Sequence, residues 1–417
     1  MGDRRRVVIT GLGVIAPTGI GKDVFWQSCK EGKSGIKPIT RFNPEGYDCR
    51  IAGEINNFDP LDYMDPKKAK RSDRFAHFAI ASARMAISDA QLNLDKIEKD
   101  RVGVFYGAAM GGMPYAENQH LIFMEKGIKR VSPYLAETIF PGAASCHIGL
   151  EFGFRGVNGT LSTGCSSGTD AIGHALDAIR CGRADIIIAG GTEDPLGPLT
   201  FASFVVIRAL TRSNDEPEKA TKPFDLNRDG FALSEGAGSL VLEELGHAIK
   251  RGAKIYAEIG GYGSSCDAFH MVQPSPDGSG MSVAIKSALR DADITTDEVD
   301  FIKAHGTSTT LNDVSETRAI KTAFGERAYH IPVSSIKSGL GHTWGASGAI
   351  EAAACTMAIQ DQFLPPTINY ETPDPQCDLD YVPNKGRAAS VEVVITNSAS
   401  FGGKNSSLLI RKYYDTY

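Results

Sequence analysis

The chain has 417 residues, enough for one large domain or two domains of ordinary size. Its 23% charged and 42% hydrophobic residues are typical of a soluble globular protein. The net charge of −6 argues against a nucleic-acid-binding protein, and no run approaches the ~20 apolar residues that a membrane span requires. The apolar run 7–9 is also too short for a signal peptide.

Short apolar segments, which we predict to be strands, alternate with helical patterns along the chain. This alternation predicts an α/β fold with buried sheets. In chain order, the strand candidates are residues 6–10, 102–106, 185–189, 301–304, 331–334 and 391–396.

The junction around Cys165 is the strongest local signal. Residues 161–168 read LSTGCSSG: a strand-like stretch, a glycine turn and the start of a helix whose apolar stripe includes Ile172, Leu176 and Ile179. A thiol at the N-terminus of a helix lies in the positive field of the helix dipole, which favours the nucleophilic thiolate. None of the eight cysteines forms a C-x-x-C pair, so we expect no metal site, no disulfide framework and a reduced cytoplasmic setting.

The sequence also repeats itself. Residues 86–92 (AISDAQL) are similar to residues 288–294 (ALRDADI), and each segment precedes an acidic linker, a strand and a glycine-rich stretch. Residues 167–172 and 347–350 share a second pattern, and both are expected to begin helices. We therefore predict an internal duplication.

Two histidines lie far downstream of the cysteine in glycine-rich settings, His305 in HGTST and His342 in GLGH. Cys165 falls in the first predicted half, residues 1–255, and both histidines fall in the second, residues 256–417. The interface between two related halves is a common place for a reaction site. One nucleophile with two histidines favours carbon–carbon bond formation on a thioester over simple hydrolysis.

Several long motifs in order resemble the β-ketoacyl–acyl carrier protein synthases, the elongating condensing enzymes of the thiolase superfamily. They are RVVITGLGVIAPTG near the start, the Cys165 junction, and residues 222–244, 304–309, 333–342 and 397–405. The resemblance runs from end to end. It implies an α/β, thiolase-like, five-layered α/β/α/β/α fold with two pseudo-symmetric halves.

Two branches of the family share features with this chain. Residues 162–171 (STGCSSGTDA) look like the ketosynthase (alpha) subunits of type II polyketide systems, whereas HGTST and the FGG loop look fatty-acid-like. Ser234, Thr310 and Lys404 depart from both patterns, which usually carry glycine, proline and threonine there. The resemblance implies a 3-oxoacyl-[acyl-carrier-protein] synthase, an acyltransferase of polyketide or fatty acid elongation. The alternatives are a non-elongating or chain-length-shaping homologue and a fatty-acid-only synthase.

The resemblance also assigns roles to the central residues. Cys165 would receive an acyl chain from a carrier thioester. His305 and His342 would aim N–H groups at the enolate oxygen that forms when a malonyl thioester loses CO₂, and either could help deprotonate the thiol. Lys337 is expected to act electrostatically, with Glu351 as its candidate partner.

Further residues match positions around that centre. Phe401 matches a gating phenylalanine whose backbone N–H, with that of Cys165, would form a second oxyanion hole for acyl transfer. Thr307 and Thr309 match positions that hydrogen-bond the pantetheine arm, and Met110 matches a position in the acyl pocket.

Asp313 and Glu316 match acidic positions that orient the site, although a helix N-cap and an N3 acid explain them equally well.

The implied partner is an acidic acyl carrier protein. A basic cluster could dock this carrier or simply be a solvated face: Lys67, Lys68, Lys70, Arg71 and Arg74. No cofactor is expected beyond the phosphopantetheine of the carrier. A homodimer, or a heterodimer with a ketosynthase-like chain-length factor, is implied.

Three other classes of protein fit less well. A papain-like cysteine hydrolase would carry a different sequence around its nucleophile. A degradative thiolase normally needs a second cysteine near the C-terminus, and none follows Cys377. A non-catalytic partner subunit would usually lack the nucleophile.

Overall fold

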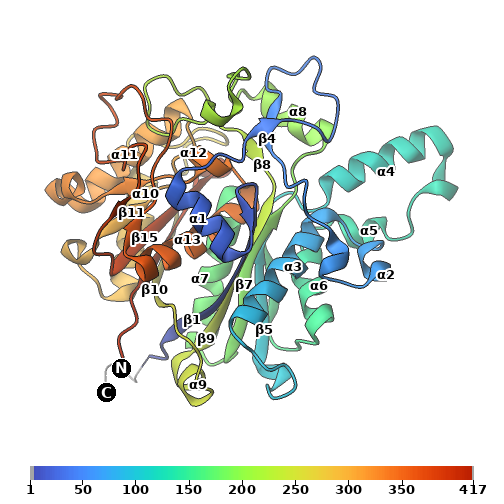
Figure 1. Ribbon diagram of the computed structural model, residues 1–417, viewed down its shortest axis with the longest axis horizontal. Helices are drawn as coiled ribbons and strands as arrows, with labels where there is room; N and C mark the ends of the chain where they lie inside the picture. Colours follow the sequence, from blue (N-terminus) through green and yellow to red (C-terminus); the bar gives the residue numbers. More distant parts are fainter. Residues whose placement is uncertain (1–3, 416–417) are drawn as a thin grey trace.

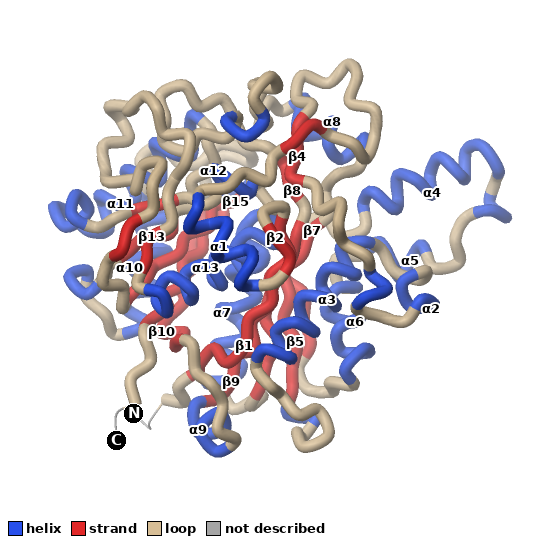
Figure 2. The backbone as a smooth tube through the Cα atoms, viewed as in Figure 1, coloured by secondary structure: helices blue, strands red, loops and turns tan. Residues whose placement is uncertain are grey.

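The computed structural model describes residues 4–415, and within that range one mixed sheet of eleven strands runs through the molecule between helices (Figures 1 and 2). Neighbouring strands follow the order β12 (Val333–Ser334), β11 (Phe301–Lys303), β15 (Val393–Ser400), β16 (Lys404–Arg411), β10 (Ala257–Cys266), β1 (Val7–Ala16), β9 (Gly236–Glu244), β7 (Ile186–Glu193), β5 (Val102–Gly107) and β6 (Asn158–Leu161). The short β2 (Gly19–Ile20) pairs with β1 beside this path.

The sheet consists of two matching halves that meet where β1 pairs antiparallel with β10. Outward from this seam, β9, β7, β5 and β6 follow β1, while β16, β15, β11 and β12 follow β10. In each half the first two pairings are antiparallel and the last two are parallel. The halves therefore share one topology, as the repeated sequence segments predict.

Glycines at equivalent positions let one helix lie close to each half. A Cβ at Gly11 would come within 2.2 Å of the Ala86 carbonyl oxygen in α3 (Arg74–Asp89). A Cβ at Gly261 would come within 2.4 Å of the Ala288 carbonyl oxygen in α10 (Ser279–Ala292). Side chains at these two positions would push the helices off the sheet, since close-packed interiors have no room to absorb them.

Two further helices, α7 (Ser167–Arg180) and α13 (Ser347–Asp361), pack together between the halves and contact strands of both. The outer face of the first half is covered by α3 and α6 (Ala143–Phe152), and that of the second by α10 and α11 (Thr310–Phe324). The layers α/β/α/β/α predicted from the sequence are therefore present.

The two central helices begin in the same way. Each follows a 3₁₀ turn, Gly164–Ser166 before α7 and Trp344–Ala346 before α13, so that Cys165 and Gly345 occupy equivalent places. The two helix starts lie against each other, because a Cβ at Gly168 would be 2.9 Å from the Ala349 nitrogen.

All six predicted strands are present, although several bounds differ. The predictions for residues 6–10 and 185–189 were too short. β1 continues through Gly11 and Gly13, which lie under α3, and β7 continues through Gly190, which lies against β9, and Gly191, which lies against the start of α7. The prediction for residues 331–334 began too early, since Pro332 has no N–H to donate and β12 begins after it. The strand predicted at 391–396 begins two residues later and extends to Ser400.

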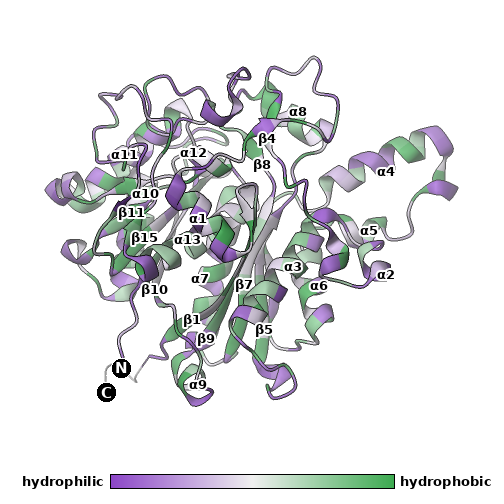
Figure 3. Cartoon of the chain, viewed as in Figure 1, coloured by the Kyte–Doolittle hydropathy of each residue, from purple (hydrophilic) through white to green (hydrophobic). Residues whose placement is uncertain are grey.

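Smaller elements surround this frame, and the strands carry mostly hydrophobic residues while the loops at the top of the view are largely hydrophilic (Figure 3). The remaining helices are α1 (Lys22–Glu31), α2 (Pro66–Ala69), α4 (Met113–Lys126), α5 (Leu135–Ile139), α8 (Pro198–Val206), α9 (Leu245–Lys250) and α12 (Lys337–Leu340). The remaining strands are β3 (Lys37–Pro38), β4 (Ile51–Gly53), β8 (Leu233–Ser234), β13 (Phe363–Leu364) and β14 (Arg387–Ala388).

The predicted domain boundary at residues 255 and 256 falls just before β10, and the division at that point stays a prediction. Between residues 4 and 415, none of the helices is both long and apolar enough to cross a membrane.

Candidate active site

Cys165 lies at the N-terminus of α7, where the strand–turn–helix junction was predicted. The preceding Gly164 has φ +62°, a left-handed conformation that glycine adopts without steric cost. The turn buries the Cys165 side chain to 4% exposure, inside an apolar cluster that includes Phe231 and Trp344. The thiol is therefore held at the end of a helix in a largely dry environment.

Burial changes the expected ionisation of the thiol. It raises the pKa of Cys165 to about 12, although the Lys337 ammonium and the Ser400 hydroxyl act in the opposite direction. The sequence predicted that the helix dipole would favour the thiolate. In the folded protein, desolvation of the buried sulfur acts against this field and favours the protonated thiol.

The two predicted histidines meet the cysteine. The Cys165 sulfur and one ring nitrogen from each of His305 and His342 all lie within 4.8 Å of one another. The two imidazoles are perpendicular, with ring centroids 5.4 Å apart. Burial lowers the pKa values of both histidines well below 6.5, and the charge of Lys337 lowers them further. Both rings are therefore neutral at physiological pH.

Hydrogen bonding fixes the tautomer of His342. The Trp344 backbone N–H donates to Nδ1 of His342 at 3.3 Å, and the Ser347 hydroxyl lies 2.9 Å from the same atom. A neutral ring that accepts at Nδ1 carries its proton on Nε2. Among the described residues, that Nε2 and the Nδ1 of His305 are buried without a hydrogen-bond partner, so the His342 N–H is free to bind an anionic oxygen.

Two buried carboxylates hold the loop that carries His305. Glu316 accepts hydrogen bonds from the backbone N–H groups of His305 and Gly306, both at 2.8 Å. Asp313 accepts from the N–H of Thr307 at 3.1 Å. The N-cap of α11 is Thr309, so the two acids bind the loop instead of capping the helix. Burial raises the pKa of each carboxyl.

Lys337 pairs with Glu351, as the sequence suggested, and both side chains are buried. Sequence reasoning missed a second lysine: Lys303 Nζ lies 2.9 Å from the same carboxylate oxygen and donates to the Ala304 carbonyl at 2.7 Å. Burial lowers the pKa of Lys337, although Glu351 opposes this shift. Two ammonium groups thus share one carboxylate beside the imidazoles. A lysine inside the predicted buried strand FIKA, residues 301–304, was the signal that could have revealed it.

The reacting groups line one shared pocket. Phe401 lines it beside Cys165, and its ring contacts Trp344 edge-on at 5.4 Å between centroids. Thr307 and Thr309 also line the cavity, and their hydroxyl oxygens lie 2.9 Å apart.

Met110 packs against the apolar cluster that contains Cys165. Its position depends on Glu193, a buried acid that sequence reasoning missed. The Glu193 carboxylate accepts from the backbone N–H groups of Ala109, Met110, Gly111 and Gly345 at 2.8–3.1 Å. Burial raises the pKa of Glu193 to about 7, although these amides act in the opposite direction.

The predicted docking cluster needs one correction. Lys67, Lys68, Lys70 and Arg71 are exposed around α2. Arg74 is not available, because its guanidinium donates to the fully buried Glu235 carboxylate at 2.7 and 2.8 Å. Its charge is neutralised inside the protein, so Arg74 has a structural role.

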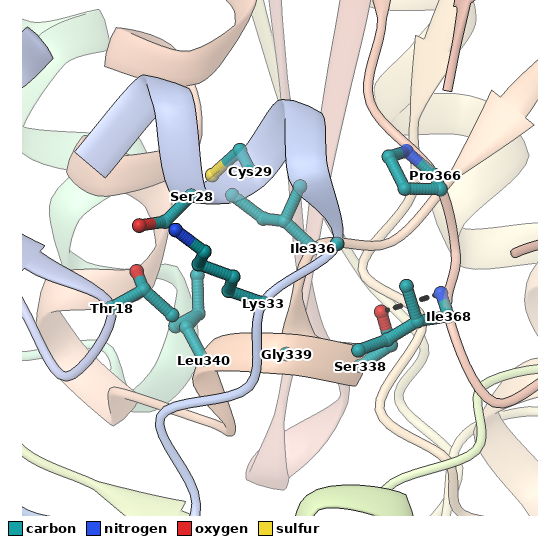
Figure 4. A pocket seen from close by; sticks show the side chains of 11 residues that line it. Thr18, Ser28, Cys29, Lys33, Ile336, Ser338, Gly339, Leu340, Pro366 and Ile368 are labelled. Atoms are coloured by element: carbon teal, nitrogen blue, oxygen red, sulfur yellow. Dashed lines mark hydrogen bonds between the residues drawn. The ribbon is translucent and has the colours of Figure 1, made fainter. Parts of the chain in front are cut away.

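A separate small pocket lies between α1 and α12 and shares no lining residue with the reaction cavity (Figure 4). There the Ser338 hydroxyl accepts from the Ile368 N–H at 3.0 Å. A Cβ at Gly339 would lie 2.6 Å from the Lys33 carbonyl oxygen. These contacts brace the short helix that carries Lys337 into the site.

Comparisons with known proteins cover the whole chain. The family model for the β-ketoacyl synthase N-terminal domain matches residues 4–248, and the model for the C-terminal domain matches residues 256–371. A relative from Synechocystis called 3-oxoacyl-[acyl-carrier-protein] synthase 2 is 47% identical over 411 residues, with 99% of each chain covered.

Two solved structures share the fold. The ishigamide ketosynthase/chain length factor superposes with a TM-score of 0.93 at 38% identity, covering 99% of this chain and 100% of that one. A type II polyketide acyl-carrier protein in complex with its ketosynthase, bound to the hexaketide, gives a TM-score of 0.88, also at 38% identity and with the same coverage. These similarities agree with the thiolase-like fold expected from the sequence.

Proposed function

The chain belongs to the β-ketoacyl synthase family, and from that premise we propose that it is a 3-oxoacyl-[acyl-carrier-protein] synthase that joins malonyl units to a Cys165-bound acyl chain. The observation that carries this proposal is one buried thiol and two neutral imidazoles within 4.8 Å of one another. The 47% identity to the Synechocystis relative favours fatty acid elongation. Similarity to polyketide ketosynthases, at 38% identity, supports polyketide elongation as the second candidate.

The first half-reaction loads the acyl chain. The Cys165 sulfur attacks the carbonyl carbon of a carrier-bound thioester, and the bond from that carbon to the pantetheine sulfur breaks. The thiol proton passes through a histidine to the departing sulfur, so protons and charge balance. Because the resting thiol is protonated, its proton must leave as the attack proceeds.

The second half-reaction forms the carbon–carbon bond. A malonyl thioester loses CO₂, and the N–H groups of His305 and His342 stabilise the enolate oxygen that results. The enolate carbon then attacks the acyl carbon on Cys165, which releases the sulfur and yields a 3-oxoacyl thioester on the carrier. Burial keeps both rings neutral, and the charge of Lys337 reinforces this state. No cofactor is required beyond the carrier's phosphopantetheine.

A Cys165→Ala variant tests this function directly. We expect it to form no acyl-enzyme and no condensation product, while still decarboxylating malonyl carrier through the two histidines. Intact-protein mass spectrometry after incubation with an acyl carrier measures the first outcome, and release of CO₂ measures the second. Acylation that persists in the variant would exclude Cys165 as the nucleophile.

A cysteine and two histidines at this spacing are also potential zinc ligands. Loss of activity on treatment with a chelator would therefore indicate a metal site in place of the proposed thiol chemistry.

The exposed basic cluster around α2 is the proposed docking site for an acidic carrier protein. We expect the double substitution of Lys70→Glu and Arg71→Glu to raise KM for carrier substrates while leaving kcat nearly unchanged. Charges at the rim of an interface affect the rate of association with the carrier more than they affect the chemical step. The rise in KM should be smaller at higher salt, which screens these charges. The matched control reverses Lys286, on α10, to Glu. Equal KM values for wild type and the double variant at low salt would rule out this surface.

This chain exposes an apolar surface that a second chain could cover. In Figure 1, α4 projects from the body as an arm, and it carries exposed Met113, Leu121, Phe123 and Met124. Next to it, α8 exposes Leu199 and Val206. Apolar exposure of this extent is typical of a protein interface. We infer that a second copy, or a ketosynthase-like chain-length factor, covers this arm, in line with the similarity to the ishigamide ketosynthase/chain length factor.

A further inference from the structure

The backbone N–H of Cys165, which acyl transfer needs as an oxyanion donor, is already occupied. It donates to the hydroxyl oxygen of Ser400 at 3.0 Å. Gly164 makes room for this contact, because a Cβ there would lie 2.1 Å from the Ser400 oxygen. The hydroxyl therefore lies over the nucleophile turn, where the oxygen of an incoming thioester carbonyl has to bind.

Ser400 belongs to a hairpin that is attached to the nucleophile turn at both ends. It ends β15 and pairs in register with Lys404, the first residue of β16. Lys404 Nζ lies 3.3 Å from the buried Asp170 carboxylate in α7. Asp170 in turn accepts from the Thr163 hydroxyl at 2.5 Å, two residues before the nucleophile. The ion pair holds Ser400 in place.

The turn between these two residues is the part of the hairpin that can change shape, and its movement opens the Ser400–Lys404 pair at its base. Its residues are Phe401, Gly402 and Gly403, and the glycines have φ values of 82° and 74°. Gly402 is exposed, and its N–H donates to the Met271 carbonyl at 2.7 Å, outside the sheet. Glycines in this region of φ exchange between conformations at little cost. The Gly403 carbonyl accepts from the Asp267 N–H at 2.7 Å, so withdrawal of the end of β15 from Cys165 requires this bond and the bond to Met271 to break.

We propose that Ser400 is a positioning residue whose hydroxyl competes with the thioester carbonyl for the Cys165 N–H, so that acyl transfer starts only after the hairpin turn withdraws it. This inference rests on the proposed function and concerns the transfer of the acyl chain to Cys165. The carbonyl carbon still moves from the pantetheine sulfur to the Cys165 sulfur, and the departing sulfur takes the proton. Decarboxylation uses the N–H groups of the two histidines and does not depend on Ser400.

The test compares the two half-reactions in Ser400→Ala. Loss of the competing hydroxyl removes one hydrogen bond that the substrate must displace, so we expect single-turnover acylation to be about three- to tenfold faster. The rate of malonyl decarboxylation does not depend on the Cys165 N–H and should stay within about twofold of the wild-type rate. Ser400→Thr keeps the hydroxyl on an extended residue and should retain the wild-type acylation rate. Ser287→Ala on α10 is the matched control for a lost hydroxyl.

Lys404→Gln provides an independent variant. It loosens the far end of the hairpin without touching the hydroxyl, and we expect it to speed acylation in the same direction by a smaller factor. If either variant misfolds, the other still tests the idea.

The results that would refute the role of Ser400 differ from the result that would overturn the proposed function. The Ser400 hydroxyl also acts on the Cys165 sulfur, where it favours the thiolate. If this support dominates, Ser400→Ala will slow both acylation and alkylation by iodoacetamide, and the competition is refuted. Unchanged acylation in Ser400→Ala would refute it as well. A wild-type protein that neither acylates nor decarboxylates would instead overturn the proposed function.

Discussion

We expect the His342→Ala variant to decarboxylate malonyl carrier about 10²–10³-fold more slowly than wild type, a loss of ~3–4 kcal/mol of transition-state stabilisation. The reason is geometric. Nε2 of His342 carries the proton, is buried and has no hydrogen-bond partner within residues 4–415, so it can donate its full hydrogen bond to the enolate oxygen. Release of CO₂ under single-turnover conditions measures the loss.

His342→Gln is the informative companion, because its side-chain amide keeps a donor near the same place. We expect it to recover part of the rate that alanine loses. His174, on α7, provides a matched control: His174→Ala should decarboxylate at the wild-type rate. If His342→Ala decarboxylates within threefold of wild type, on the order of a single weak hydrogen bond, the ring is not the donor.

The neutral state of the two rings also predicts a pH dependence. Their folded pKa values lie well below 6.5, so the unfolded chain binds more protons than the folded chain as pH falls below about that value. The contribution of these histidines to stability is therefore complete above pH 6.5 and is lost on acidification. Urea unfolding at pH 7.5 and at pH 5.5 should give a lower midpoint at the acidic pH, by a smaller margin in the double His→Ala variant.

Glu351→Ala should be the most destabilising single substitution around the site. It leaves Lys303 and Lys337 fully buried beside each other without a counter-charge, and breaking a buried pair in this way typically costs about 3–5 kcal/mol. Urea titration followed by far-UV circular dichroism measures the shift in the unfolding midpoint.

Lys303→Met separates charge from packing. It removes the extra ammonium and keeps the Lys337–Glu351 pair, so we expect a change below about 1.5 kcal/mol in either direction. A surface comparison is Glu31→Ala, which breaks the pair with the exposed Lys33 and should cost little. If Glu351→Ala unfolds at the same urea concentration as Lys303→Met, the uncompensated charge is not what destabilises it.

Much of the fold could be predicted from the pattern of the sequence. Alternating strands and helices, together with the repeats at 86–92 and 288–294, pointed to two similar halves, and the strand order has that symmetry. Strand lengths were harder to predict. Gly11 interrupts the apolar run of β1, and only the approach of α3 in three dimensions explains why the strand continues through it.

Some residues of the site were predictable from the sequence and others were not. Cys165, His305 and His342 stand beside glycines in distinctive motifs, so their convergence was predictable. Glu193 and Ser400 act through backbone N–H groups that are far away in sequence, and no local pattern marks such contacts. The effect of burial on the ionisation of the thiol was not predicted, because the dipole of a helix can be inferred from its residues, whereas the depth of burial cannot.

The equivalence of Cys165 and Gly345 has a consequence for how such a duplicated scaffold can evolve. Gly345 offers its N–H to Glu193, and a Cβ there would lie 2.5 Å from that carboxylate. The second copy of the turn therefore carries no side chain at this place and supports the first copy through its backbone. A reactive side chain placed at 345 would displace the Glu193 carboxylate and so disturb the site at Cys165 instead of adding a second one.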